Sequence, residues 1–212
     1  MTDAGAVREK IGALAADPRA AGLIRLLRRR GALPQTRIAR QLGLTPPTLN
    51  RLVARLRAEG LLEARAEPTG RNRPAAGLRA DLGYVIAAEY APHFIRTAVV
   101  GFDGRLRNHE EHAVDIRDPH RMIDRLIETV GELERRTTGP AGELLAVAAV
   151  DCGMVDVRTG VVVASSLFPA AKDLAVAPPL ARALGVPVTL SSTAPGRLVA
   201  VDRVELHERY AD

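Results

Sequence analysis

Polar side chains that can recognise nucleic-acid bases recur along residues 45–59. The polar residues are Thr48, Asn50, Arg51 and Arg55, and four apolar residues are interspersed with them. Helical spacing places the polar set opposite the apolar set of Leu49, Leu52, Val53 and Leu56. Arg can donate a bidentate pair to guanine, Asn can pair with adenine, and Thr can contact a phosphate or a thymine methyl. The segment is therefore predicted to be a helix that can enter the major groove of duplex DNA.

The start of this helix is marked by a proline pair. Thr45 is placed as its N-cap, and Pro46 and Pro47 follow in a first turn, where a missing backbone amide is tolerated. The preceding segment, PQTRIARQLG, is predicted to be a shorter helix that ends at Gly43, and its first turn carries Thr36 and Arg37. Thr36, Arg37 and Thr45 therefore join the candidate DNA-binding residues.

A second basic feature follows the candidate recognition helix. Residues 61–79, LLEARAEPTGRNRPAAGLR, are predicted to form two short strands around a Gly- and Pro-rich tip that carries Arg71 and Arg73. Two guanidinium groups on such a tip suit a phosphate or a narrow minor groove. A further amphipathic helix, Pro18 to Arg30 with Asp17 as N-cap, comes first in the chain. Three helices followed by a basic hairpin are the order of a winged helix-turn-helix domain.

The charge is divided unevenly along the chain. Residues 1–80 hold 16 Arg and Lys against 6 Asp and Glu, whereas residues 81–212 hold 14 against 19. A basic N-terminal third favours a phosphate-bearing partner at that end, although a general preference for arginine would give a similar excess. All six aromatic residues lie after residue 80, which argues against stacking on single strands and favours duplex DNA. A module that binds only other proteins remains an alternative.

Residues 81–212 change to a strand-rich pattern. Strands are predicted at 83–90, 93–102 and 105–114, and a helix at 119–136. Strands at 143–151 and 160–165, a helix ending at Gly185, a strand at 186–190 and a last helix at about 197–210 complete the pattern. The predicted fold class is α+β with two domains. A winged helix-turn-helix domain at residues 1–80 precedes a single ribonuclease-H-like (actin-like ATPase) α/β lobe at residues 81–212.

Several classes of site and location are disfavoured by the sequence. The apolar runs are too short for a membrane span, and no signal peptide is visible, so a cytoplasmic protein without membrane contact is expected. The single cysteine, Cys152, permits no disulfide or cysteine-based zinc cluster within one chain. His109 and His112 lie three apart on a predicted strand and face opposite sides, so no metal site is expected there. No cofactor is predicted.

The order of these motifs resembles the repressor/ORF/kinase (ROK) family, whose regulators join a winged helix to a sugar-kinase-like body. The stretches that carry the resemblance are LGLTPPTLNRLVARLRAEGLLE, TGRNRP, GYVIAAEYAPHFIRTAVVGFDGRL, DCGMVDVRTGVVVASS and ALGVPVTLSSTAPG. The resemblance covers most of residues 18–200. It implies a transcriptional regulator, with a repressor expected, that binds double-stranded DNA as a homodimer.

Departures from the family pattern point away from catalysis. The family's kinases begin the body with an Asp-x-Gly-Gly-Thr phosphate turn, where this chain has residues 89–93, EYAPH. Their Asn-Asp pair is replaced by Ser192 and Thr193, and a threonine cannot act as a general base near neutral pH. The chain also stops at Asp212, before the family's zinc site and second lobe. We therefore expect no catalytic residues and no enzyme activity, with a kinase remnant of residual activity as the alternative.

Two roles remain for the body. Ser191, Ser192 and Thr193 can hydrogen-bond a polyol, so a sugar-like effector is expected as a small-molecule partner. The predicted last helix carries the apolar residues Leu198, Val199, Val201, Val204 and Leu206. Their burial between two copies would form the homodimer.

Overall fold

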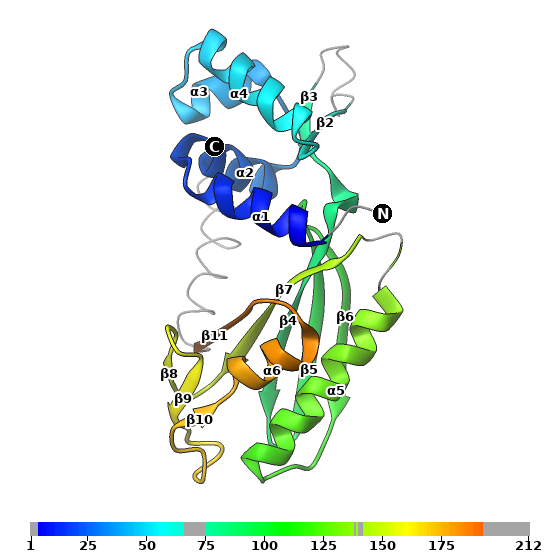
Figure 1. The fold of residues 1–212 in the computed structure, drawn as a ribbon, viewed down its shortest axis with the longest axis vertical. Coiled ribbons are helices and arrows are strands. Elements are labelled where there is room, and N and C mark those ends of the chain that lie inside the picture. Colours follow the sequence, from blue (N-terminus) through cyan, green and yellow to red (C-terminus); the bar gives the residue numbers. More distant parts are fainter. Residues whose placement is uncertain (1–3, 66–74, 138, 140–141, 193–212) are drawn as a thin grey trace, which may run out of the picture. The chain divides into compact units, whose positions relative to one another are not determined.

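The computed structural model describes residues 4–65, 75–137, 139 and 142–192 (Figure 1). The chain divides into two compact units. The first comprises Met1–Tyr84, Val100–Arg107 and Thr138–Leu145, and the second comprises Val85–Val99, Asn108–Thr137 and Ala146–Asp212. Short pieces of the later sequence thus belong to the N-terminal unit. The functional division proposed after residue 80 stays a prediction.

Three helices of the first unit confirm the predicted helix-turn-helix order. They are α2 (Pro18–Arg30), α3 (Gln35–Leu42) and α4 (Pro46–Ala58). Asp17 caps α2 as predicted, because its carboxylate accepts hydrogen bonds from the amides of Arg19 at 2.9 Å and Ala20 at 3.2 Å. Gly43 ends α3 in the left-handed conformation, with φ of 62°, which a side chain would disfavour. This glycine sets the turn between α3 and α4.

A fourth helix, α1 (Ala4–Ala15), lies where the sequence predicts no element. Its apolar residues Val7 and Leu14 are buried, and Ile11 packs between them at the same helical spacing. Gly5 and Gly12 lower the helix propensity of this stretch. Tertiary burial of the apolar face therefore compensates for a weak local signal.

A small antiparallel sheet completes the winged arrangement. The predicted hairpin is confirmed by β2 (Leu62–Arg65) and β3 (Ala75–Leu78), which pair with Leu62 opposite Leu78. The unpredicted two-residue strand β1 (Leu33–Pro34) pairs with the other edge of β3, and it is too short to give a periodic pattern. The predicted tip between β2 and β3 lies outside the described residues.

The body is built on a five-stranded sheet with the order β11-β7-β4-β5-β6. Its strands are β4 (Tyr84–Ala91), β5 (Phe94–Gly101), β6 (Leu106–Ala113), β7 (Leu144–Asp151) and β11 (Val188–Ser192). Strand β11 runs parallel to β7, whereas consecutive strands β4, β5 and β6 follow one another through tight turns. The mixed α/β body confirms the predicted fold class.

Two helices and a smaller sheet accompany the main sheet. The helices α5 (Pro119–Thr137) and α6 (Ala177–Leu184) pack against each other, and both confirm predicted helices. The smaller sheet consists of β8 (Met154–Asp156), β9 (Val161–Ala164) and β10 (Leu174–Ala175), of which only β9 is predicted. A 3-10 turn, η1 (Ala80–Leu82), precedes β4. The helix predicted at about 197–210 lies outside the described residues.

None of the described helices combines the length and the apolar character that crossing a bilayer requires.

Candidate nucleic-acid interface

Helix α4 separates its apolar and polar residues cleanly. The predicted stripe of Leu49, Leu52, Val53 and Leu56 is buried in the apolar cluster of the first unit. Asn50, Arg51 and Arg55 are exposed, and Thr48 is half-buried. Burial of the stripe fixes which side of the helix meets solvent. The predicted base-contacting residues are therefore brought together on one helix with their side chains directed outward.

The N-terminus of α4 is open to a ligand. Thr45 occupies the N-cap position in an extended conformation, as predicted, but its hydroxyl oxygen lies 2.9 Å from that of Thr48 and makes no cap hydrogen bond. Pro46 and Pro47 are exposed and lack amides, and the first turn contains no acidic residue. The first turn of α4 thus carries no negative charge that would repel a phosphate.

Arg55 differs from Arg51 in its partners. The Arg55 guanidinium donates to the Asp17 carboxylate at 2.6 Å and lies 3.8 Å from Glu59. This contact joins α4 to the N-cap of α2. The Arg55 hydrogen bond, followed by the Ala20 amide, lowers the pKa of Asp17 below its ordinary value of 3.8. Arg51 has no ion pair among the described residues, so its guanidinium is the better placed for a base.

The remaining predicted contacts fall in three places. Thr36 and Arg37 are exposed on the first turn of α3, next to α4 in the helix-turn-helix. Arg71 and Arg73 lie outside the described residues, so their placement stays a prediction. The candidate ligand contacts Ser191 and Ser192 lie in β11, and these two are considered below.

One further arginine of α4 was missed by the sequence analysis. Arg57 is half-buried, and its Nε and one terminal nitrogen are buried without a hydrogen-bond partner in the described part of the chain. Arg57 follows Asn50 by seven residues, so the two lie on one flank of the helix. That spacing is the signal that could have identified it. A buried guanidinium without a partner costs free energy unless an anion satisfies it.

The body places several polar groups at the ends of strands β7 and β11. The parallel register sets Ser192 beside Asp151 and Ser191 beside Val150. Asp151 is 1% exposed and accepts the Gly153 amide at 2.6 Å. Ser191 and Ser192 are half-buried, while Thr193 lies outside the described residues. A serine thus lies next to a buried aspartate where β7 and β11 end.

A buried tyrosine extends this polar edge. Tyr90 is 2% exposed, and burial together with the Asp151 carboxylate raises its pKa above the ordinary value of 10.0. Its hydroxyl lies close to the Asp151 carboxylate. Burial, followed by the charge of Asp151, also raises the pKa of the Cys152 thiol, so this cysteine is not activated as a nucleophile.

The turn between the first two strands of the body is compact. Strands β4 and β5 are joined by a two-residue turn, Pro92 and His93, whose carbonyl oxygens accept the amides of Ile116 and Val114. Pro92 has no amide to donate to a phosphate. His109 and His112 both lie in β6, and no cluster of metal-ligating side chains is found in the described parts of the chain.

Comparisons with known proteins define the class. A family model described as the MarR family matches residues 17–71. Within this range, the described residues 17–65 form the helix-turn-helix and the first wing strand of a MarR-type winged helix-turn-helix, which is joined to the mixed α/β body described above. Among solved structures, a ROK family transcriptional regulator, described as a homolog of the E. coli MLC protein, matches with a TM-score of 0.59 and 19% sequence identity. The predicted fold class and the predicted resemblance are thereby confirmed.

The extent of these likenesses is limited. The regulator match covers 81% of this chain and 44% of the regulator, so the chain spans less than half of that protein's length. A Streptomyces griseus ROK family glucokinase, solved with glucose and AMPPNP, matches with a TM-score of 0.45, 17% identity and coverage of 52% and 33% of the two chains. A Thermus thermophilus ROK hexokinase matches with a TM-score of 0.43, 24% identity and coverage of 51% and 35%. A search of curated proteins found no match.

Replacing Asp17 with Asn distinguishes the contribution of the ion pair to stability from that of the helix cap. Asn keeps an oxygen that can accept the Arg19 and Ala20 amides, but it carries no charge. Because folding lowers the pKa of Asp17, the pair's stability is fully present above the unfolded value near 3.8 and is lost as the pH falls through the folded value. We expect Asp17→Asn to reduce the free energy of unfolding by at most about 1 kcal/mol near neutral pH, since both side chains are partly exposed.

The measurement is chemical denaturation of both proteins across a pH series. The difference between them should shrink as the pH falls below the ordinary carboxyl pKa of 3.8. A difference that stays constant down to the most acid condition would show that the charge of Asp17 contributes nothing.

Proposed function

We propose that this chain is a sequence-specific transcriptional regulator that binds duplex DNA through α4 and acts as a repressor. The observation that carries the proposal is the exposed pair Asn50 and Arg51 on a helix whose opposite side is fully buried. Such a helix can place amide and guanidinium hydrogen-bond donors against the edges of the bases in the major groove. A repressor needs only to occupy its operator, so binding alone supplies the activity.

The small DNA-binding surface of a single winged helix favours a homodimer. One winged helix contacts few base pairs, and two copies on a symmetric operator would combine two such contacts through a high effective concentration. We therefore propose a homodimer that recognises two half-sites.

The body is proposed to bind a small polar effector without acting on it. Ser192 supplies a hydroxyl group beside the buried Asp151, and the buried Tyr90 hydroxyl lies near the same carboxylate. Sugar hydroxyls can both donate to the carboxylate and accept from such groups. Thr193 extends the same row in the sequence. The polar groups at the ends of β7 and β11 support the proposal of effector binding. The structural matches to sugar kinases concern the fold alone and do not support it.

Selection of duplexes from a random pool tests the DNA-binding proposal. We expect enrichment of one sequence in two half-sites about one helical turn, or a multiple of it, apart. On that duplex, Arg51→Ala should weaken binding by about 1–3 kcal/mol, or about 5- to 150-fold, and relax the preference at one base pair per half-site. Fluorescence anisotropy titrations measure both effects.

Arg25→Ala is the matched control, because Arg25 is an exposed arginine on α2 away from the candidate interface. It removes the same charge and should leave the sequence preference unchanged. Equal effects of the two substitutions would mean that α4 does not contact bases. A pool without any enriched sequence would favour a module that binds proteins.

The wing supplies a separate prediction. Replacing Arg71 and Arg73 together with alanine should weaken binding to all duplexes alike, because phosphate contacts carry no sequence information. The slope of log affinity against log salt should fall by about one for each lost phosphate contact. An unchanged slope would exclude these two residues from the phosphate contacts.

The alternative of a sugar kinase is tested by turnover. A coupled assay with ATP and a panel of hexoses and amino sugars should show no activity above a blank, since Ser192 and Thr193 cannot remove a hydroxyl proton near neutral pH. Saturable phosphorylation of any sugar would overturn this expectation and return the chain to the enzyme class.

A further inference from the structure

The apolar core around the DNA-binding helices contains a residue from the body's sequence. Phe102 follows β5 at the tip of the β5–β6 hairpin, yet it is 2% exposed and belongs to the same apolar cluster as Leu27 and Leu56. Leu145, at the start of β7, is buried in that cluster as well. We call this hairpin tip, residues 101–105, the insertion tip. It belongs to the first compact unit.

The insertion tip is held against the last turn of α2. The Arg28 Nε donates to the Phe102 carbonyl oxygen at 3.0 Å, and the same guanidinium lies over the Phe102 ring, 5.0 Å from its centroid. Gly104 has φ of 81°, and a Cβ there would stand 3.0 Å from the Arg28 carbonyl oxygen. The close approach of the two backbones therefore requires glycine at this position.

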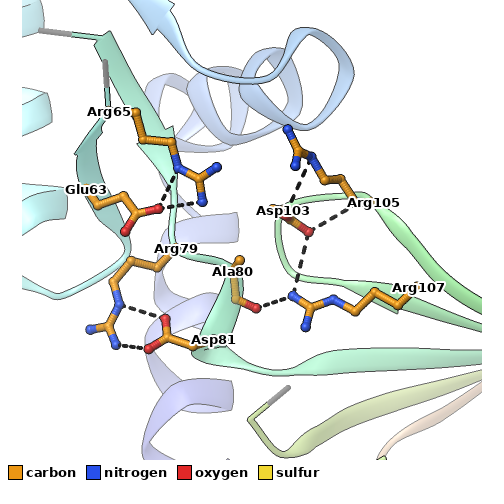
Figure 2. Close-up of polar contacts among 8 residues, drawn as sticks. All are labelled: Glu63, Arg65, Arg79, Ala80, Asp81, Asp103, Arg105 and Arg107. Carbon is orange, nitrogen blue, oxygen red and sulfur yellow. Dashed lines mark hydrogen bonds and ion pairs between the residues drawn. The ribbon is translucent and has the colours of Figure 1, made fainter. Parts of the chain in front are cut away.

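The insertion tip is also bonded to the segment that leaves the wing. Figure 2 shows Arg107 donating to the carbonyl oxygen of Ala80, two residues after the end of β3, while Asp103 lies 3.9 Å from both Arg105 and Arg107. The Phe102 amide donates to the Gly83 carbonyl oxygen at 2.9 Å. One short hairpin thus contacts α2 on one side and the exit of β3 on the other.

The exit of β3 is itself tied to the wing strands and to α4. Arg79 forms a bidentate pair with Asp81 (Figure 2). The Arg79 amide donates to the carbonyl oxygen of Leu61, which follows α4. Gly77 of β3 lies against Arg65 of β2. A displacement of the exit segment would therefore shift the base of the wing relative to α4.

We propose that Phe102 and Arg107 are positioning residues of the DNA-binding surface. Phe102 completes the core beneath α2 and α4, and Arg107 fixes the exit of β3, so that α4 and the wing keep one relative geometry. The inference rests on the DNA-binding function proposed above. It adds a hairpin outside residues 1–80 to the segments that position the DNA-binding surface.

The test uses the full chain and two substitutions at the insertion tip. Phe102→Ala removes a buried ring and should speed amide exchange in α2 and β3 at least about 100-fold. Arg107→Gln keeps the core and should leave the exchange of α2 unchanged, while it weakens affinity for the selected duplex several-fold. Phe102→Leu, which refills most of the volume, should restore most of the protection.

Phe94→Ala is the control in the second unit. Phe94 lies at the other end of β5, is half-buried, and has the Arg96 guanidinium over its ring, 4.1 Å from the centroid. This variant should leave the exchange of α2 and the DNA affinity unchanged. An equal loss of DNA affinity from Phe94→Ala would overturn the proposal, because general damage to the body would then explain the result.

Two other outcomes would also contradict it. Unchanged exchange of α2 in Phe102→Ala would show that the insertion tip does not support the core. Lost protection with full DNA affinity would show that it supports the core without positioning the surface. If the unsubstituted chain binds no duplex, the proposed function fails. The amide exchange of α2 and β3 in Phe102→Ala still decides whether the insertion tip anchors these elements.

Discussion

Burial of one apolar stripe on α4 is the constraint on which the candidate interface depends. Leu49 and Leu56 are each about 1% exposed or less, and Leu52 and Val53 are nearly as deeply buried between α2, α3 and the small sheet. Rotating α4 about its axis would expose these side chains at a cost of about 1.5–3 kcal/mol each. The opposite side therefore has a fixed orientation. Asn50 and Arg51 face solvent because the burial of the four apolar residues leaves them on the exposed side of the helix.

Electrostatic contacts then divide the arginines of α4 between structure and binding. Arg55 is engaged by Asp17, the residue that caps α2, so its charge is partly neutralised within the first unit. Arg51 has no such partner among the described residues, and Arg57 has buried nitrogens without one. A single helix thus carries one arginine that ties helices together, one that is exposed without an ion pair among the described residues, and one with buried, unpartnered nitrogens. Exposure alone would not have separated these roles.

Much of the fold could be predicted from local signals. Asp17 before Pro18 and Gly43 after α3 each determine a chain direction within a few residues, and both are found where they were expected. The elements that were missed have weak local signals. Helix α1 contains two glycines, and β1 and β10 have two residues each.

The candidate site was predictable only in part, for a related reason. Helical periodicity identified the exposed residues of α4, because that pattern is local. The Arg55–Asp17 pair spans 38 positions and the Arg28–Phe102 contact spans 74, and such pairings depend on tertiary packing. The same holds for the Ser192–Asp151 juxtaposition, which arises from the parallel register of β11 and β7.

The proposed function requires that α4 contact the bases of duplex DNA. Amide hydrogen exchange of the full chain, compared with and without a duplex selected by this protein, tests it most directly. If α4 contacts bases, exchange should slow at the N-terminal half of α4 and at the first turn of α3, while exchange in β11 and α5 should stay unchanged. Protection confined to the body, or no protection in α4 under saturating duplex, would contradict it.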